Sequence, residues 1–164
     1  MDYRYHGALL GALKKYDQAI EEYGKALEKD ESQVDLWREI ADAYELKNDY
    51  TQAIAAYKKY YDSLAQDKKT SENLFQLGRL YYGEGTSSDT LSVQSADRMA
   101  ALQAADSVFA LVAEQASDSY LGDMWRARTH SAMDPKLQRD WRNLITRRWW
   151  TYCLPKTNRG TTLH

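Results

Sequence analysis

Histidine and cysteine are the side chains of this sequence best suited to metal binding or nucleophilic catalysis. The three histidines, His6, His130 and His164, are far apart in the chain, and no two share the i, i+4 spacing of a metal-binding pair on a helix. The single cysteine, Cys153, has no identifiable base partner. We therefore expect no metal site and no activated nucleophile, and we expect His6 to be a packed side chain rather than a ligand.

Glycine-rich and acidic segments give no stronger indication of catalysis. The segment Gly83-Glu84-Gly85 lacks the third glycine and the preceding strand of a phosphate-binding loop. The carboxylate pairs Glu21–Glu22 and Asp42–Glu45 fit exposed helix faces better than a site for general acid–base catalysis. The sequence therefore predicts a protein without enzymatic activity and without a cofactor.

The elements that carry these side chains are predicted to be helices. The two prolines are Pro135 and Pro155, so the first 134 residues contain no helix breaker of that kind. Strand-like alternation bounded by turn signals is absent, and with 43% hydrophobic residues the chain can bury a core. A single cysteine excludes a disulfide framework within the chain. We expect an all-α fold.

The hydrophobic residues are not arranged for a membrane or for export. No segment reaches the roughly 18 consecutive apolar residues that a transmembrane helix requires. Residues 1–5 have neither the charged region nor the apolar region of a signal peptide. We expect a cytoplasmic protein, or a periplasmic or secreted one if an N-terminal signal is missing from this sequence.

An internal repeat organises most of the chain. At an offset of 34 residues, a segment around Ala19 and Tyr23 matches one around Ala53 and Tyr57, and Tyr3 matches Trp37. Each unit reads as two helices with apolar residues at helical spacing, in the second unit from about 34 to 46 and from 50 to the middle 60s. Small residues are expected where paired helices approach closely: Gly7, Ala41 and Gly78 on first helices, and Ala19, Ala53 and Ala105 on second helices.

The later units depart from this period. A third unit begins near residue 71, and its second helix is delayed to about 96–114, so that residues 83–95 are predicted to form a loop. A fourth unit begins near residue 119 and stops at Pro135. The predicted domain therefore covers residues 1–135, with about 3.5 repeats at 1–32, 33–69, 70–117 and 118–135.

These residues resemble the tetratricopeptide repeat family, and in particular long bacterial proteins with many such repeats. The resemblance covers about residues 1–135 and is strongest in the first two units. It implies an α-solenoid of antiparallel helix pairs, wound as a right-handed superhelix. It also implies a concave groove, lined by the first helix of each pair, in which members of the family usually bind an extended peptide or a helix of a partner protein.

Carried over to this sequence, the groove implies a set of partner-binding residues. The positions offer both charges but lack the asparagines with which some members clamp the C-terminal carboxylate of chaperones, so such a clamp is not expected. The function implied is a protein–protein interaction scaffold whose partner is a protein or peptide, without nucleic acid. The groove-facing residues would be Arg4, Arg38, Asp42, Glu45, Phe75, Arg79, Tyr82 and Arg128.

The last 29 residues differ from the rest in composition. Residues 1–135 have a charge balance of −8, whereas residues 136–164 have a balance of +6 and contain three of the five tryptophans. We interpret residues 136–164 as an irregular basic tail, and we hypothesise that it is a frameshift product on a fragment of a longer repeat protein. One alternative is that this tail binds nucleic acid or a membrane surface. Another is that the repeats are an accessory module of a larger enzyme.

The two ends of the repeat array predict self-association. Repeat arrays need terminal helices with a polar outer face. This chain begins within a first helix and its fourth unit has no second helix, so we expect apolar surface around Met124 and Trp125 to be exposed.

Overall fold

The computed structural model describes residues 2–87 and 96–134, and within these ranges the chain is helical and contains no strand. None of the helices in these ranges is long and apolar enough to pass through a lipid bilayer. The helices are α1 (Tyr3–Ala12), α2 (Tyr16–Lys29), α3 (Asp35–Leu46), α4 (Tyr50–Ser63), α5 (Ser71–Thr86), α7 (Ala96–Gln115) and α8 (Leu121–Met133), with a 3-10 turn, η1 (Gln66–Lys68), between α4 and α5.

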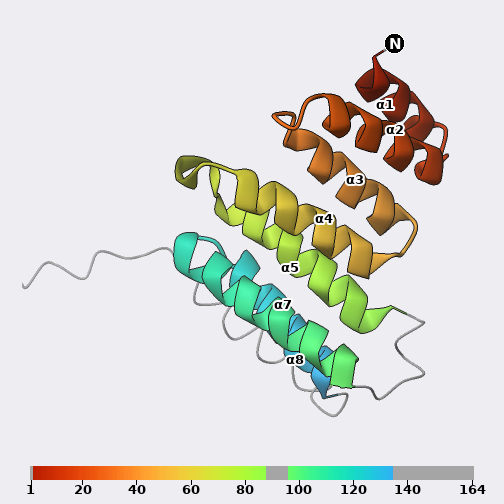
Figure 1. The fold of residues 1–164 in the computed structure, drawn as a ribbon. Helices are drawn as coiled ribbons and strands as arrows, with labels where there is room; N and C mark the ends of the chain where they lie inside the picture. Colours follow the sequence, from red (N-terminus) through yellow and green to blue (C-terminus); the bar gives the residue numbers. More distant parts are fainter. Residues whose placement is uncertain (1, 88–95, 135–164) are drawn as a thin grey trace, which may run out of the picture.

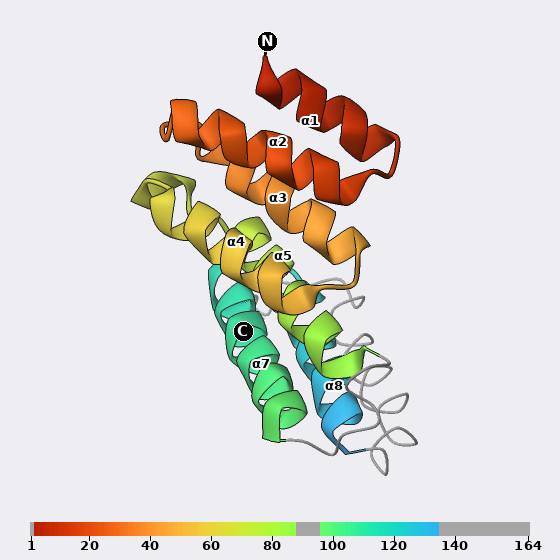
Figure 2. The ribbon, with the colours of Figure 1, turned by 45° about the vertical axis from the view of Figure 1, so that its right-hand side comes forward.

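Successive helices lie side by side in antiparallel pairs, so the pairs form a row (Figures 1 and 2). Helix α1 packs against α2, α3 against α4, and α5 against α7, while α8 packs against α7 and also touches α5. Between the pairs, α2 contacts α3 and α4 contacts α5. This arrangement confirms the predicted α-solenoid. The division into four units stays our interpretation, and the predicted tail lies outside the described residues.

Each helix contributes one apolar stripe to a continuous core. On α3, Leu36, Ile40 and Ala43 are buried at spacings of four and three residues, which is one face of an α-helix. The same face meets buried tyrosines of the neighbouring helices, Tyr23 and Tyr57. Because no pair covers its own stripe completely, each pair is stabilised by stacking on the next.

Glycine allows two of the helix pairs to approach closely. A Cβ atom on Gly7 would lie 2.6 Å from the ring of Tyr23, and one on Gly78 would lie 2.7 Å from the ring of Phe109. The alanines predicted to serve the same purpose on second helices are completely buried: Ala19, Ala53 and Ala105 each have an exposed fraction of 0%. The predicted close approach is therefore confirmed at Gly7 and Gly78, and the three alanines are buried as a close approach requires.

The turns inside the first two pairs share a backbone conformation as well as a sequence position. Lys14 between α1 and α2 has a φ of 60°, and Asn48 between α3 and α4 has a φ of 61°. The two residues are one 34-residue period apart. Asparagine adopts this left-handed conformation readily, whereas for lysine it costs about 1 kcal/mol. The repeat therefore dictates the turn geometry even where the residue type is unfavourable.

The predicted loop at residues 83–95 is wrong at its beginning. Helix α5 continues to Thr86 and includes Gly83 and Gly85. Both glycines face close neighbours: Gly83 lies against the ring of Tyr50, and a Cβ on Gly85 would lie 2.6 Å from Leu102. Glycine here indicates close packing within a helix rather than a turn. Residues 88–95 of the predicted loop lie outside the described residues.

Lysine side chains cover several aromatic rings at the surface. The Lys59 ammonium lies 4.2 Å from the ring centre of Trp37, and Lys29 lies 4.4 Å from that of Tyr3. In both cases the lysine is on the second helix of a pair and the ring is on the first. The cation is attracted to the negative face of the ring while its methylene chain shields the ring from water. These contacts join the two helices of a pair at their solvent-facing edge.

Candidate partner-binding surface

The eight residues predicted to face a partner lie on the first helix of each pair and on α8, which begins the fourth unit. We call them the first-helix surface: Arg4 on α1, Arg38, Asp42 and Glu45 on α3, Phe75, Arg79 and Tyr82 on α5, and Arg128 on α8. The structure joins four of them in two pairs, Glu45 with Arg79 and Tyr82 with Arg128. Arg4 and Arg38 are exposed, and within residues 2–87 and 96–134 neither forms a hydrogen bond or ion pair with the other six.

An ion pair connects α3 to α5. The Arg79 guanidinium donates one hydrogen bond to Glu45 Oε1 at 3.1 Å and another to Gln76 Oε1 at 3.0 Å. Both partners of the ion pair are partly exposed, with 28% of the Glu45 side chain and 39% of the Arg79 side chain accessible. A pair of this kind contributes at most about 1 kcal/mol to stability. Its main effect is to fix the direction of the Arg79 guanidinium on the first-helix surface.

Asp42 lies one turn before Glu45 on α3. The surrounding protein removes water from its carboxyl group and so raises its pKa, and the nearby negative charge of Glu39 raises the pKa further. Arg38 opposes the shift from the same helix.

An aromatic cluster joins α5, α7 and α8. The ring of Trp125 lies 5.6 Å from Phe75, 5.4 Å from Tyr82 and 5.4 Å from Phe109, measured between ring centres. The contacts with Phe75 and Tyr82 are edge-on, at interplanar angles of 85° and 89°, which is a favoured geometry for aromatic pairs. Phe109 is completely buried at the base of the cluster. The cluster thus gives α8 a fixed position on α5.

Arg128 lies on the exposed side of this cluster. Its guanidinium carbon is 5.3 Å from the ring centre of Tyr82 and 4.9 Å from that of Trp125, and its Nε donates a hydrogen bond to the Tyr82 hydroxyl at 3.2 Å. The two rings and the hydroxyl hold the planar guanidinium in one orientation. Since Arg128 is exposed, its terminal nitrogens are available to an anionic group of a partner.

The expected exposure of Met124 and Trp125 is wrong, because both residues are half-buried. Trp125 is covered by the rings of Phe75, Tyr82 and Phe109. The carried-over groove positions did not include Trp125 or Phe109. Both are large aromatic residues in the third and fourth units, which could have indicated a role. Their positions relative to α5 could not be predicted, because the extra residues before α7 interrupt the repeat.

Two histidines, His6 and His130, each lie beside a carboxylate of a neighbouring helix. His6 Nδ1 lies 2.8 Å from Glu22 Oε2, and His130 Nε2 lies 3.2 Å from Asp106 Oδ1. His6 packs against α2 through this contact and is partly exposed, while its neighbour Gly7 takes the position that faces α2 directly. Across the described portions of the chain, no three histidine, cysteine or acidic side chains gather closely enough to hold a metal ion.

The carboxyl group of Glu22 gives the α1–α2 pair a dependence on pH. The Lys25 ammonium at 2.9 Å, followed by the His6 ring, holds the pKa of Glu22 below its ordinary value of 4.5. Because the pKa of Glu22 is lower in the folded state, its ionised carboxylate stabilises the fold at pH values above the ordinary pKa. This stabilisation is lost as the pH falls through the lowered pKa.

We expect Glu22→Gln to lower the urea midpoint at pH 7 and to lose this effect near pH 3. Unfolding followed by circular dichroism checks this, with the exposed Glu28→Gln on the same helix as the control. An equal loss at both pH values would contradict it.

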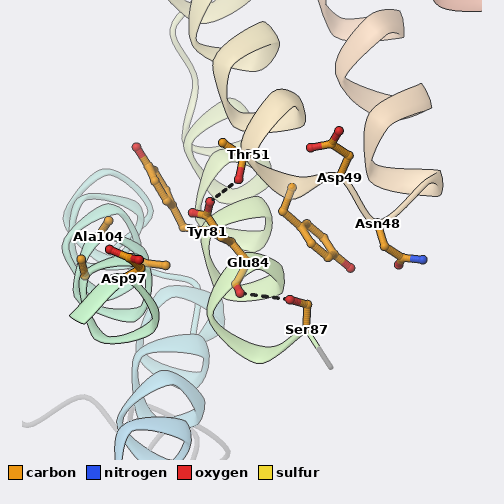
Figure 3. Close-up of a pocket in the computed structure, with 11 residues that line it drawn as sticks. Asn48, Asp49, Thr51, Tyr81, Glu84, Ser87, Asp97 and Ala104 are labelled. Atoms are coloured by element: carbon orange, nitrogen blue, oxygen red, sulfur yellow. Dashed lines mark hydrogen bonds between the residues drawn. The ribbon is translucent and has the colours of Figure 1, made fainter. Parts of the chain in front are cut away.

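A depression of about 750 Å³ lies elsewhere, between the start of α4, the end of α5 and the start of α7 (Figure 3). Among the described residues, its walls include the carboxylates of Asp49, Glu84 and Asp97 and no histidine, cysteine or basic side chain. Glu84 accepts a hydrogen bond from the Thr51 hydroxyl at 2.9 Å, so its carboxylate serves to join α4 to α5. Sequence reasoning did not single it out, because its residues come from three helices.

The comparisons with known proteins agree with this geometry. Residues 6–68 match the sequence pattern of the tetratricopeptide repeat family, and the described helices form an α-solenoid. Its fold is similar to the crystal structure of the C-terminal part of a TPR repeat-containing protein from Cytophaga hutchinsonii, with a TM-score of 0.66 and 23% sequence identity.

At this identity the likeness concerns the fold alone. The match covers 93% of this chain and 52% of that one, so this chain spans about half the length of the structure it resembles. The search of curated proteins found no match.

Proposed function

We propose that this chain is a non-catalytic scaffold that holds a peptide or a helix of a partner protein against its first-helix surface. Tetratricopeptide repeats generally mediate protein–protein interaction, and residues 6–68 match that repeat. The right-handed superhelix and the concave groove that the resemblance implies are part of this proposal. So is the assignment of the eight residues to the binding surface.

The observation that carries the proposal is the placement of Arg128 over Tyr82 and Trp125. Arginine, tyrosine and tryptophan are the residues that most often dominate protein–protein binding energy. Here the arginine is exposed and already oriented by two rings, so that little side-chain entropy is lost when a partner binds. We propose that Arg128 receives an acidic side chain or a terminal carboxylate of the partner, and that Phe75 and Tyr82 contact its apolar residues.

A displayed library of random peptides, selected on the immobilised full chain, tests this proposal without knowledge of the natural partner. The dissociation constants of selected peptides are then measured by fluorescence polarisation. We expect Arg128→Ala to weaken binding at least about tenfold, the usual minimum for an arginine that anchors an interface. The exposed Lys68→Ala, which removes one positive charge from η1, should leave binding within about twofold, because a distant surface charge contributes little. Peptides that bind both variants equally would contradict the proposal.

The same peptides distinguish the scaffold from the basic tail. Replacing Trp149 and Trp150 by alanine should leave the affinity unchanged if the first-helix surface holds the peptide. Loss of binding in that variant, with Arg128→Ala unaffected, would assign binding to residues 136–164 instead. Those residues lie outside the described ranges, so the frameshift hypothesis and the tail-binding alternative stay predictions.

A further inference from the structure

Arg98 joins the ends of three helices. It lies in the first turn of α7, where its Nε donates a hydrogen bond to the Gly85 carbonyl oxygen at 3.0 Å and its Nη2 donates another to the Ala132 carbonyl oxygen at 2.8 Å. Gly85 is in the last turn of α5, and Ala132 is in the last turn of α8. Figures 1 and 2 show the start of α7 beside the ends of these two helices.

Both carbonyl groups lack a donor within their own helix, because the last four carbonyls of an α-helix have no intrahelical N–H partner. The positive charge of Arg98 also lies at the negative ends of the α5 and α8 dipoles, although it lies at the positive end of its own helix. A cation in the first turn is thus unfavourable for α7 itself, and the two neighbouring helix ends account for its position. The planar guanidinium reaches both of them with two different nitrogens.

This bridge lies one helical turn beyond the contact between Tyr82 and Arg128. Gly85 follows Tyr82 by three residues on α5, and Ala132 follows Arg128 by four residues on α8. Residues at these spacings are neighbours on a helix. Arg98 therefore fixes the separation of α5 and α8 next to the place where the Tyr82 hydroxyl accepts a hydrogen bond from Arg128.

Helix α8 packs mainly against α7 and is held to α5 at fewer points. Its start is close to α7, since a Cβ on Gly122 would lie 2.5 Å from the Ala113 backbone nitrogen. Toward α5, its first half contributes the ring of Trp125 to the aromatic cluster, and its last turn is held by Arg98. Two separated points determine the direction of a rigid helix, whereas a single one would let it pivot.

We propose that Arg98 is a positioning residue for the first-helix surface: by tying the last turn of α8 to the last turn of α5, it holds Arg128 in the orientation that meets a partner. Gly85 allows this bridge, because a Cβ there would lie 2.6 Å from the Leu102 side chain and 3.3 Å from the Arg98 backbone oxygen. The effect on a partner rests on the proposed function of Arg128, whereas the orientation of α8 can be measured without a partner.

Arg98→Met keeps the length of the side chain, removes both hydrogen bonds and so tests the orientation of α8 directly. In the full chain labelled with 5-fluorotryptophan, the fluorine NMR signal of Trp125 is assigned by its loss in Trp125→Phe. We expect this signal to shift or broaden in Arg98→Met. It should stay unchanged in the control Ile54→Val, which removes a buried methyl group on α4 and lowers stability there. An unchanged Trp125 signal in Arg98→Met would overturn the proposal.

Arg98→Lys distinguishes the bridge from the charge, and it keeps the proposal testable if circular dichroism shows that Arg98→Met does not fold. Lysine retains the positive charge at the two helix ends but offers a single nitrogen, so it cannot reproduce the fork of the guanidinium. We expect a change of the Trp125 signal that is smaller than in Arg98→Met. A signal identical to that of the unaltered chain would overturn the bridge.

The peptides selected on the full chain test the consequence for binding. Arg98→Met should weaken their binding about three- to tenfold, the cost expected when an anchoring side chain must be immobilised on binding. In an Arg128→Ala background the same change should have an effect of less than about twofold, because Arg98 acts through Arg128. Equal losses in the two backgrounds would overturn the positioning role. If Arg128→Ala alone leaves the affinity unchanged, the proposed function fails, whereas a shifted Trp125 signal would still show that Arg98 orients α8.

Discussion

Replacing Phe109 by alanine is expected to lower the free energy of unfolding by about 3–5 kcal/mol, the usual cost of removing a fully buried phenylalanine. The exposed fraction of Phe109 is 0%, and its ring lies 5.4 Å from Trp125 and 5.9 Å from Phe75. Its removal leaves a cavity where α5, α7 and α8 meet. Urea unfolding followed by circular dichroism measures the loss.

Leu111 provides a matched control for Phe109 on the same helix. Its side chain is large and apolar but 47% exposed, so Leu111→Ala should change stability by less than about 1 kcal/mol. Similar losses for the two variants would show that helix α7 is not anchored through Phe109. Phe109→Ala should also weaken peptide binding at Arg128, because Phe109 supports the ring of Trp125 and that ring orients Arg128.

Replacing Gly78 by alanine is expected to cost about 1–3 kcal/mol, the range observed when an extra methyl group is forced into a packed core. The new Cβ would lie 2.7 Å from the ring of Phe109, and that ring is enclosed on all sides. The matched control is Gly24→Ala on α2, where a Cβ meets nothing within 4 Å. That change should raise stability by about 0.5–1 kcal/mol, because alanine is the better helix former.

Combining Gly78→Ala with Phe109→Ala distinguishes a steric clash from a general effect of replacing glycine. In the Phe109→Ala background the ring that opposes the methyl group is absent, so Gly78→Ala should cost nothing or become stabilising there. The coupling energy from the double-mutant cycle should then exceed about 1 kcal/mol. Additive losses, or equal losses for Gly78→Ala and Gly24→Ala, would contradict the packing that we describe.

The sequence predicted the helices well where the 34-residue period is intact. For α3 and α4 the expected bounds agree with the observed Asp35–Leu46 and Tyr50–Ser63 within about two residues, because spacing and turn residues repeat together. The period fails after Tyr82, and there the end of α5 was misread as a loop. Glycine has two uses, in turns and in close helix contacts, and residue type alone does not separate them.

The first-helix surface was harder to predict than the helices. The resemblance placed Glu45, Arg79, Tyr82 and Arg128 on first helices, but it did not indicate that they would pair as Glu45–Arg79 and Tyr82–Arg128. The residues of these pairs are 34 and 46 positions apart in the chain, so each pair depends on the side-chain directions of two different helices. The contribution of Trp125 depends in addition on the register of α7 and α8, and the extra residues before α7 interrupt the 34-residue period that would have predicted this register.

The lysines that lie over Trp37 and Tyr3 have a practical consequence for chemical labelling. Reductive methylation keeps the positive charge of Lys59 and Lys29, and so preserves their attraction to the rings. Acetylation neutralises the same nitrogens and removes that attraction, so the indole of Trp37 would become accessible to a collisional quencher such as iodide. The contribution of Trp37 to the fluorescence of a labelled sample would thus report which modification Lys59 has received.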